Sequence, residues 1–106
     1  MFISYEVSVQ LVASLREVVP IVERSDRDLA DQMRRAASSV VLNLAEGSRS
    51  HKGNKLKHFA IAHGSASEVK AALEVACAWG WIEEARVPRE LLDRLLALLW
   101  RLTHPK

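Results

Sequence analysis

The chain has 106 residues, enough for one compact domain and too few for two of ordinary size, so we expect a single domain over residues 1–106. Hydrophobic residues make up 49% of the chain and charged residues 26%, which excludes an intrinsically disordered or collagen-like protein. The formal net charge is only +2, so composition by itself indicates no function.

Turn-forming and cross-linking residues are scarce. Four glycines and three prolines are too few for a sandwich of short strands, and they favour long helices. The single cysteine, Cys77, excludes a disulfide within the chain and a zinc site built from several thiolates. No uncharged apolar stretch of about 18 residues occurs, and Glu6 interrupts any export signal. We therefore expect a cytoplasmic protein with no membrane partner.

Apolar residues at helical spacing predict a first helix over residues 4–23. Leu11 and Leu15 belong to its apolar stripe. Pro20 cannot donate a hydrogen bond to the carbonyl of Arg16. This helix therefore either kinks at the proline or ends within a turn of it.

Two longer helices are predicted in the middle of the chain. Polar residues 25–28 offer N-cap side chains for a second helix, which is expected to stop at Gly47. Residues 47–54 are rich in glycine, serine and basic side chains and predict an exposed loop. Asn54 is the expected N-cap of a third helix, the longest, which continues to about Ile82.

A fourth helix is predicted from about Pro88 to Leu102. Its leucines cover more than one face, whereas a bundle helix needs only one apolar face. With the aromatic cluster that ends the third helix, this excess predicts self-association. The alternative is that both helices lie deep in the core of one chain. The residues expected between copies are Trp79, Trp81, Leu98 and Trp100.

Two motifs on the second and third helices carry a family resemblance. The first consists of Gln32-Met33-Arg34-Arg35-Ala36-Ala37 and Asn43-Leu44-Ala45-Glu46-Gly47-Ser48. The second consists of Phe59, then Ile61-Ala62, then Gly64-Ser65, then Glu68. Together they resemble the signature of a bacterial protein family encoded in intervening sequences of 23S ribosomal RNA genes. The resemblance covers most of the chain.

The resemblance implies an all-α fold, an antiparallel up-and-down four-helix bundle that assembles as a ring of five copies, with no established enzymatic activity. This family is similar in turn to the accessory protein of diversity-generating retroelements, a pentameric bundle that engages nucleic acid and a reverse transcriptase. The loop differs from the commoner family form, which is rich in arginine and serine. It carries Ser50-His51-Lys52-Gly53-Asn54 instead.

The motif residues also predict how the second and third helices meet. Arg35 and Glu68 each lie about 18 to 20 Å from the loop between antiparallel helices, so they can face each other. Gly64 and Ser65 lie at the height of the small residues 36–39, where the backbones can approach closely. We interpret the set mainly as a packing and hydrogen-bond framework, because buried polar groups must be paired; a direct functional role is the alternative. The framework residues are Gln32, Arg35, Asn43, Glu46, Gly64, Ser65 and Glu68.

Charge is unevenly distributed. Residues 32–67 contain six basic side chains and one acidic side chain, for a net +5, and the remaining residues sum to −3. The same segment contains His51, His58 and His63, which add positive charge when they are protonated. Repeated around a ring, this basic end would neutralise several phosphates of RNA or DNA; a solvated helix end without a ligand is the alternative. The expected nucleic-acid-binding residues are Arg34, Arg49, Lys52, Lys55 and Lys57.

Patterns for catalysis and metal binding are weak. No two of the four histidines are three or four residues apart, the spacing that places two ligands on one helical face. Cys77 is flanked by alanines and is interpreted as a small core residue rather than a nucleophile. We therefore expect no enzyme, no catalytic residue, no cofactor and no bound metal. A catalytic site assembled between copies is a third, weaker hypothesis.

Two hypotheses for function follow. The first is a non-enzymatic homo-oligomer, expected to be a pentamer, whose basic end binds structured RNA or DNA. The second is a protein-interaction scaffold that docks a partner through its apolar surfaces, with the basic residues serving only solubility. Salt distinguishes them, because phosphate binding weakens steeply with ionic strength and an apolar interface does not.

Overall fold

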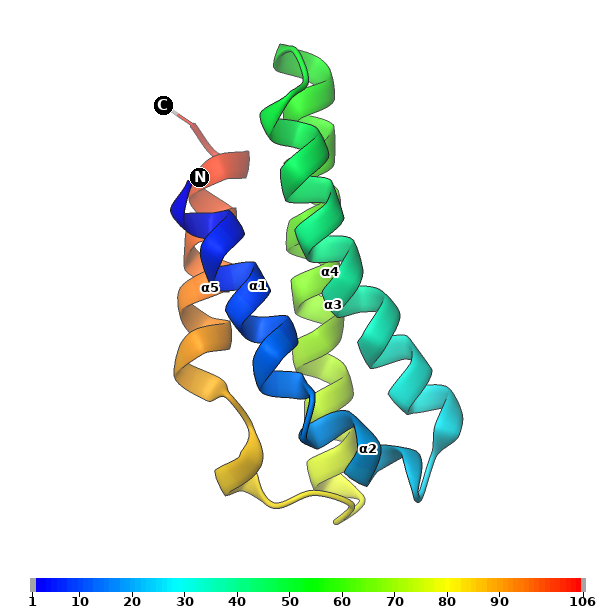
Figure 1. The fold of residues 1–106 in the computed structure, drawn as a ribbon. Coiled ribbons are helices and arrows are strands. Elements are labelled where there is room, and N and C mark those ends of the chain that lie inside the picture. The colour runs from blue at the N-terminus through cyan, green and yellow to red at the C-terminus, as the bar shows by residue number, and fades with distance from the viewer. Residues whose placement is uncertain (1, 106) are drawn as a thin grey trace.

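The computed structural model describes residues 2–105, and all the regular structure in that range is helical. Four long or medium helices and two short ones follow one another along the chain (Figure 1). They are α1 (Ile3–Leu15), α2 (Val18–Glu23), α3 (Arg27–Ser48), α4 (Lys52–Ala78), the 3₁₀ turn η1 (Glu84–Arg86) and α5 (Arg89–Thr103).

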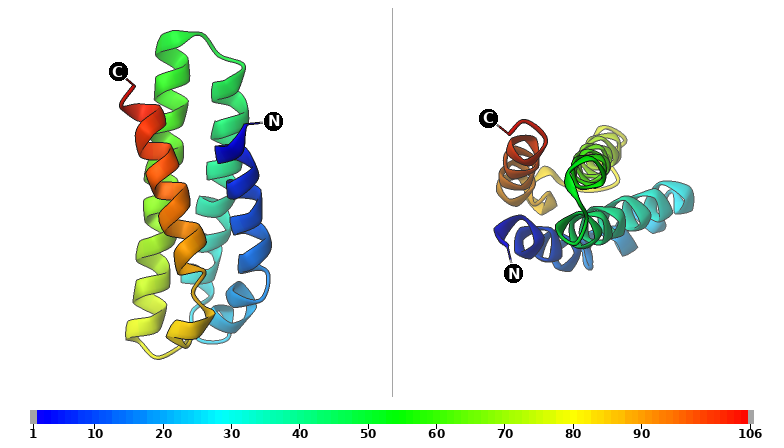
Figure 2. Two further views of the ribbon diagram at one scale, coloured as in Figure 1. Left: turned by 90° about the vertical axis from the view of Figure 1, so that its left-hand side faces the viewer. Right: turned by 90° about the horizontal axis from the view of Figure 1, so that it is seen from above.

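The helices α1, α3, α4 and α5 lie side by side and alternate in direction, so the predicted antiparallel up-and-down four-helix bundle is confirmed (Figure 1, Figure 2). α3 packs against α1 and α4, and α5 closes the bundle against α4 and α1. Seen from above, α1 and α4 occupy opposite corners (Figure 2). At one end the α3–α4 hairpin extends beyond the start of α1 and the end of α5 (Figure 1).

One buried stripe from each helix forms the core. Leu11 of α1, Met33 of α3, Leu73 of α4 and Leu95 of α5 are each at most 1% exposed. Burying a side chain of this size contributes about 1.5 to 3 kcal/mol. The core therefore fixes the relative position of all four bundle helices, and with it the position of the α3–α4 hairpin.

The first predicted helix is interrupted. α1 ends at Leu15, Arg16 and Glu17 form a turn, and α2 resumes at Val18 and includes Pro20. Proline lacks the N–H that would bond the carbonyl four residues earlier, here that of Arg16, and its ring crowds that carbonyl. The helix therefore breaks about one turn before the proline instead of bending at it.

The start of α3 is as predicted, but the loop between α3 and α4 is shorter than expected. Asp26 is the N-cap of α3, and its Oδ1 accepts a hydrogen bond from the N–H of Leu29 at 2.9 Å. The prediction that α3 stops at Gly47 was wrong, because the helix continues to Ser48. The prediction that Asn54 is the N-cap of α4 was also wrong, because α4 starts at Lys52 after an N-cap at His51.

The end of α4 also differs from the prediction. The helix stops at Ala78 instead of near Ile82, because Gly80 adopts a φ of 78°, a left-handed conformation that ends helices. The N–H of Trp81 donates to the carbonyl of Ala76 at 2.9 Å, and the N–H of Gly80 donates to that of Cys77 at 2.9 Å. These two bonds form a Schellman motif, which caps the last carbonyls of α4.

The fourth predicted helix is confirmed to within one residue at each end, as α5 follows an N-cap at Pro88. Among residues 2–105 there is no helix with the length and hydropathy required to cross a membrane.

Candidate nucleic-acid interface

The hairpin tip, which we define as residues 45–58, comprises the last turn of α3, the loop and the first two turns of α4. It lies at the end where the α3–α4 hairpin projects from the bundle (Figure 1, Figure 2). Below it, the ring of Phe59 packs against that of Phe2 with centroids 6.2 Å apart. The tip has four Lys or Arg residues and one Glu, so most of the predicted positive charge lies on a projecting element.

The lysines of the hairpin tip are accessible. Lys52 and Lys57 are exposed and Lys55 is half-buried. Within residues 2–105, no carboxylate oxygen lies within 4.0 Å of any of the three ammonium groups. α4 also begins there without a side-chain cap, so the partial positive charge of its N-terminus adds to theirs. The lysine charges are therefore available to an external anion.

Arg49 is engaged locally. Its Nη2 lies 2.9 Å from Oε2 of Glu46, one turn earlier. Both side chains are more than half exposed, and exposed ion pairs contribute at most about 1 kcal/mol. A phosphate can therefore compete for Arg49 at little cost.

Arg34 does not belong to the tip, although it was predicted to be part of the same basic end. It lies about 21 Å along α3 from Ser48, at 1.5 Å per residue. Its guanidinium contacts Asp31 at 2.8 Å and Glu23 of α2 at 3.1 Å. The structure thus places Arg34 where it links α3 to α2.

Two of the predicted framework residues join a polar network between α3 and α4. Nδ2 of Asn43 donates to the carbonyl and to Oγ of Ser39, at 2.9 and 3.1 Å. Oγ of Ser39 lies 2.9 Å from Oγ of Ser65, and Nδ1 of His58 lies 3.0 Å from Oδ1 of Asn43. Sequence reasoning considered His58 as a source of charge and as a metal ligand, but not as part of this network. Its distance from the loop, which is within one residue of that of Asn43, was the available signal.

The other predicted framework residues have different environments. Gln32, Arg35 and Glu68 are exposed, and no ion pair joins Arg35 to Glu68 among the described residues. A Cβ added to Gly64 would meet nothing within 4 Å, so no close approach occurs there. The close approach lies at Gly47, where an added Cβ would be 2.7 Å from Cε1 of Phe59.

The residues predicted at an interface between copies fall into two groups. Trp79 is 69% exposed and stacks on Trp81 at 5.8 Å, and Trp100 is 52% exposed and stacks on His104 at 4.0 Å. Trp81 and Leu98 are half-buried against the core of their own chain. Of these four residues, only Trp79 and Trp100 have more than half of their surface exposed.

The family model for the 23S rRNA-intervening sequence protein matches residues 2–101. The chain belongs to the 23S rRNA-intervening sequence protein family. The resemblance read from the two motifs is thereby confirmed, and the matched region includes the whole hairpin tip. Neither a curated protein nor a solved structure matched the chain. Similarity to the retroelement accessory protein stays a prediction.

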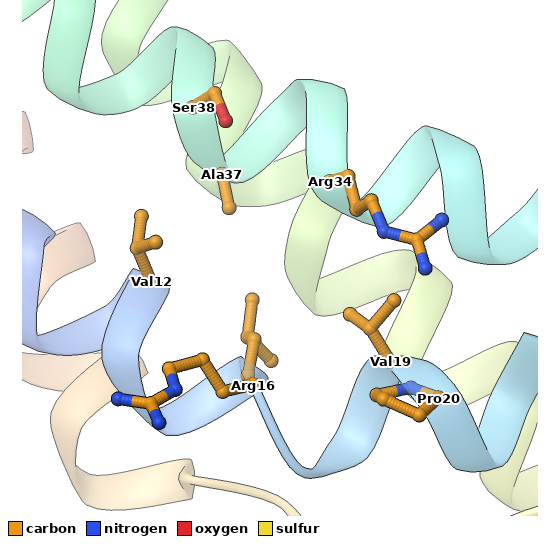
Figure 3. A pocket seen from close by; sticks show the side chains of 8 residues that line it. Val12, Arg16, Val19, Pro20, Arg34, Ala37 and Ser38 are labelled. Carbon is orange, nitrogen blue, oxygen red and sulfur yellow. The ribbon is translucent and has the colours of Figure 1, made fainter.

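This member of the 23S rRNA-intervening sequence protein family also has an open apolar groove between α1 and α3, which sequence reasoning missed (Figure 3). One part has a volume of about 340 Å³. It is lined by Val12, Leu15, Arg16, Val19, Pro20, Arg34, Ala37 and Ser38. The adjoining part is lined by Val9, Val12, Ser38, Val41 and Leu42. The groove could not be read from one helix, because its two walls come from different segments of the chain.

Cys77 is half-buried against the core near the end of α4. Burial raises the pKa of its thiol, and the nearby carboxylate of Glu84 raises it further. The thiol therefore stays protonated at neutral pH, which fits the predicted packing role better than that of a nucleophile. Residues 2–105 contain no group of three or more His, Cys, Asp and Glu side chains placed to hold a metal ion.

Proposed function

We propose that this family member is a non-enzymatic homo-oligomer that binds structured RNA or DNA through its hairpin tip. The observation that carries the proposal is the set of three lysines on the tip, Lys52, Lys55 and Lys57, which have no carboxylate partner among the described residues. The family name, which refers to 23S rRNA, supports a role connected with RNA.

The contacts would be made to phosphates rather than to bases. The tip offers ammonium groups, the Arg49 guanidinium and the N-terminus of α4, all of which bind phosphate oxygens. Its neighbouring aromatic residue, Phe59, is only 6% exposed and is not available for stacking on bases. We therefore propose binding by shape and charge with little preference for sequence.

Self-association would strengthen this binding. In a pentamer, the oligomer that the family resemblance implies, five tips would act together, and linked weak sites bind much more tightly than one. Binding of a nucleic acid requires no catalytic step, so we propose that the bundle acts by binding alone.

A fluorescence-anisotropy titration tests the proposal. The full-length protein is titrated against a labelled RNA hairpin and a labelled DNA duplex at low and at physiological salt. We expect the variant Lys52→Glu/Lys55→Glu/Lys57→Glu to lose about 100-fold or more in affinity, because three phosphate contacts are lost. The matched control is Arg24→Glu/Arg27→Glu/Arg86→Glu, which makes the same change in net charge at exposed positions at the opposite end of the bundle.

The control variant separates a specific site from general attraction. If the tip is the binding surface, the control keeps most of the wild-type affinity while the tip variant does not. Equal losses in both variants would mean that net charge alone drives binding. No binding of the wild-type protein to either nucleic acid at low salt would refute the proposal.

The apolar groove between α1 and α3 favours a second candidate, a scaffold that docks a protein partner. An apolar contact would be nearly indifferent to salt, whereas the tip contact would weaken steeply with it. Capture of a partner that survives high salt and is lost in Leu42→Glu, a change to an exposed groove residue, would support the scaffold. Capture that persists in Leu42→Glu would exclude the groove as its site.

A further inference from the structure

The groove between α1 and α3 is an exposed apolar surface with a basic edge. Val9, Val12 and Leu42 line it, and they are 44%, 36% and 67% exposed. Two arginines, Arg16 and Arg34, lie along its other part (Figure 3). Arg34 is paired with carboxylates, whereas Arg16 has no carboxylate within 4.0 Å among residues 2–105. An occupant of the groove would therefore be apolar and carry negative charge.

The outer face of α4 has the complementary properties. Between residues 60 and 79 its exposed positions are mostly small or apolar, two are acidic and none is basic. They are Ala60, Ile61, Gly64, Ser67, Glu68, Ala71, Glu74, Val75, Ala78 and Trp79. The basic residue of this stretch, Lys70, lies 4.0 Å from Asp93 of α5 and is not on this face. A surface helix normally exposes a polar face, so the outer face of α4 is unusual.

The shapes of the two surfaces also match. Small side chains at Ala60, Gly64 and Ala71 let another helix pair approach α4 closely, and nothing lies within 4 Å of an added Cβ at Gly64. On the other surface, Leu42 projects and Ser38 lies beside it in the groove. Because α1 and α4 occupy opposite corners of the bundle, one chain cannot join its own groove to its own α4 (Figure 2).

The charges of the two surfaces are complementary as well. The outer face of α4 exposes the carboxylates of Glu68 and Glu74, whereas the groove is lined by Arg16, which has no carboxylate partner among residues 2–105. The charges attract where the apolar surfaces meet.

We infer that the groove between α1 and α3 receives the outer face of α4 from a second copy of this chain. The inference rests on the self-association proposed above and specifies its contact. Because the two surfaces differ, the contact is head-to-tail, and each copy keeps one free groove and one free α4 face for further neighbours. Such a contact closes into a ring when the rotation between copies allows it.

Mixing of two blocked variants tests this contact, with masses measured by light scattering after size exclusion in the absence of nucleic acid. Leu42→Glu blocks the groove and Ala71→Glu blocks the α4 face. Each variant alone should raise the dissociation constant for self-association by about 100-fold or more, because a carboxylate is buried without a partner. An equimolar mixture should form a heterodimer, since the groove of one variant and the α4 face of the other remain intact.

The control is Ile3→Glu, an exposed apolar residue outside both surfaces, which should keep the wild-type mass. If either blocked variant loses its helical signal in circular dichroism, Val9→Glu and Val75→Glu test the same two surfaces. A normal mass for Ala71→Glu, or a mixture that stays monomeric, would overturn the head-to-tail contact. A monomeric wild-type protein would refute self-association itself, while the separate titration still decides nucleic-acid binding.

Discussion

Gly47 illustrates how one missing side chain positions the hairpin tip. The sequence suggested a helix stop, since glycine commonly ends helices, but α3 runs through this position. The glycine instead leaves room for the ring of Phe59, which would lie 2.7 Å from an added Cβ. A packing role of this kind depends on a residue 12 positions away, so local sequence rules could not reveal it.

We predict that Gly47→Ala lowers the free energy of unfolding by about 1 to 3 kcal/mol, because the Phe59 ring must shift. Gly53→Ala, also in a helix at the tip but with open space around it, should be neutral or stabilising by up to about 1 kcal/mol. Urea denaturation of both variants gives the comparison. A Gly47→Ala protein as stable as Gly53→Ala would show that the ring adapts without cost.

We also predict that the polar network around Asn43 stabilises the fold. Asn43→Ala removes the partner of His58 and the bonds to Ser39, and should cost about 1 to 3 kcal/mol, because half-buried polar groups lose their partners. Gln32→Ala, at an exposed position of the same motif, should change stability by less than about 0.5 kcal/mol. Thermal unfolding of the two variants distinguishes the network from the exposed residues. Equal losses of stability in the two variants would contradict a stabilising role for the Asn43 network.

Among the helices, the apolar periodicity was sufficient to predict which segments are helical. The ends of the helices were harder to predict, because they depend on the capping of backbone groups rather than on the apolar stripe. Asn54 is a favourable N-cap residue, yet the chain enters α4 three residues earlier. Similarly, apolar residues continue to Ile82, which is buried, but Gly80 ends the helix first.

Gly80 is therefore expected to be sensitive to substitution. Gly80→Ala should destabilise the protein by about 1 to 2 kcal/mol, because an L-residue is disfavoured at a φ of 78°. Asn tolerates this conformation better than Ala does, so Gly80→Asn should recover part of the loss. Chemical denaturation measures both changes. The absence of any difference among glycine, alanine and asparagine would contradict the capping role.

At the scale of the whole molecule, the sequence predicted that positive charge collects near the loop, but not how it is laid out. Counting charges along the chain placed Arg34 with the lysines, whereas the antiparallel layout places it beside Glu23 of α2. The groove was missed for a related reason. Val12 and Ser38 line it together, and only the packing of α1 on α3 brings them to one surface.

If the tip lysines neutralise phosphates, the salt dependence of binding to duplex DNA must reflect their number. The slope of log affinity against log salt is measured between about 50 and 200 mM for the wild type and for Lys52→Gln/Lys55→Gln/Lys57→Gln. Each neutralised phosphate contributes about 0.9 to the slope, so the variant should be shallower by about 2.7 for each engaged copy. Identical slopes for the two proteins would show that the tip lysines neutralise no phosphates.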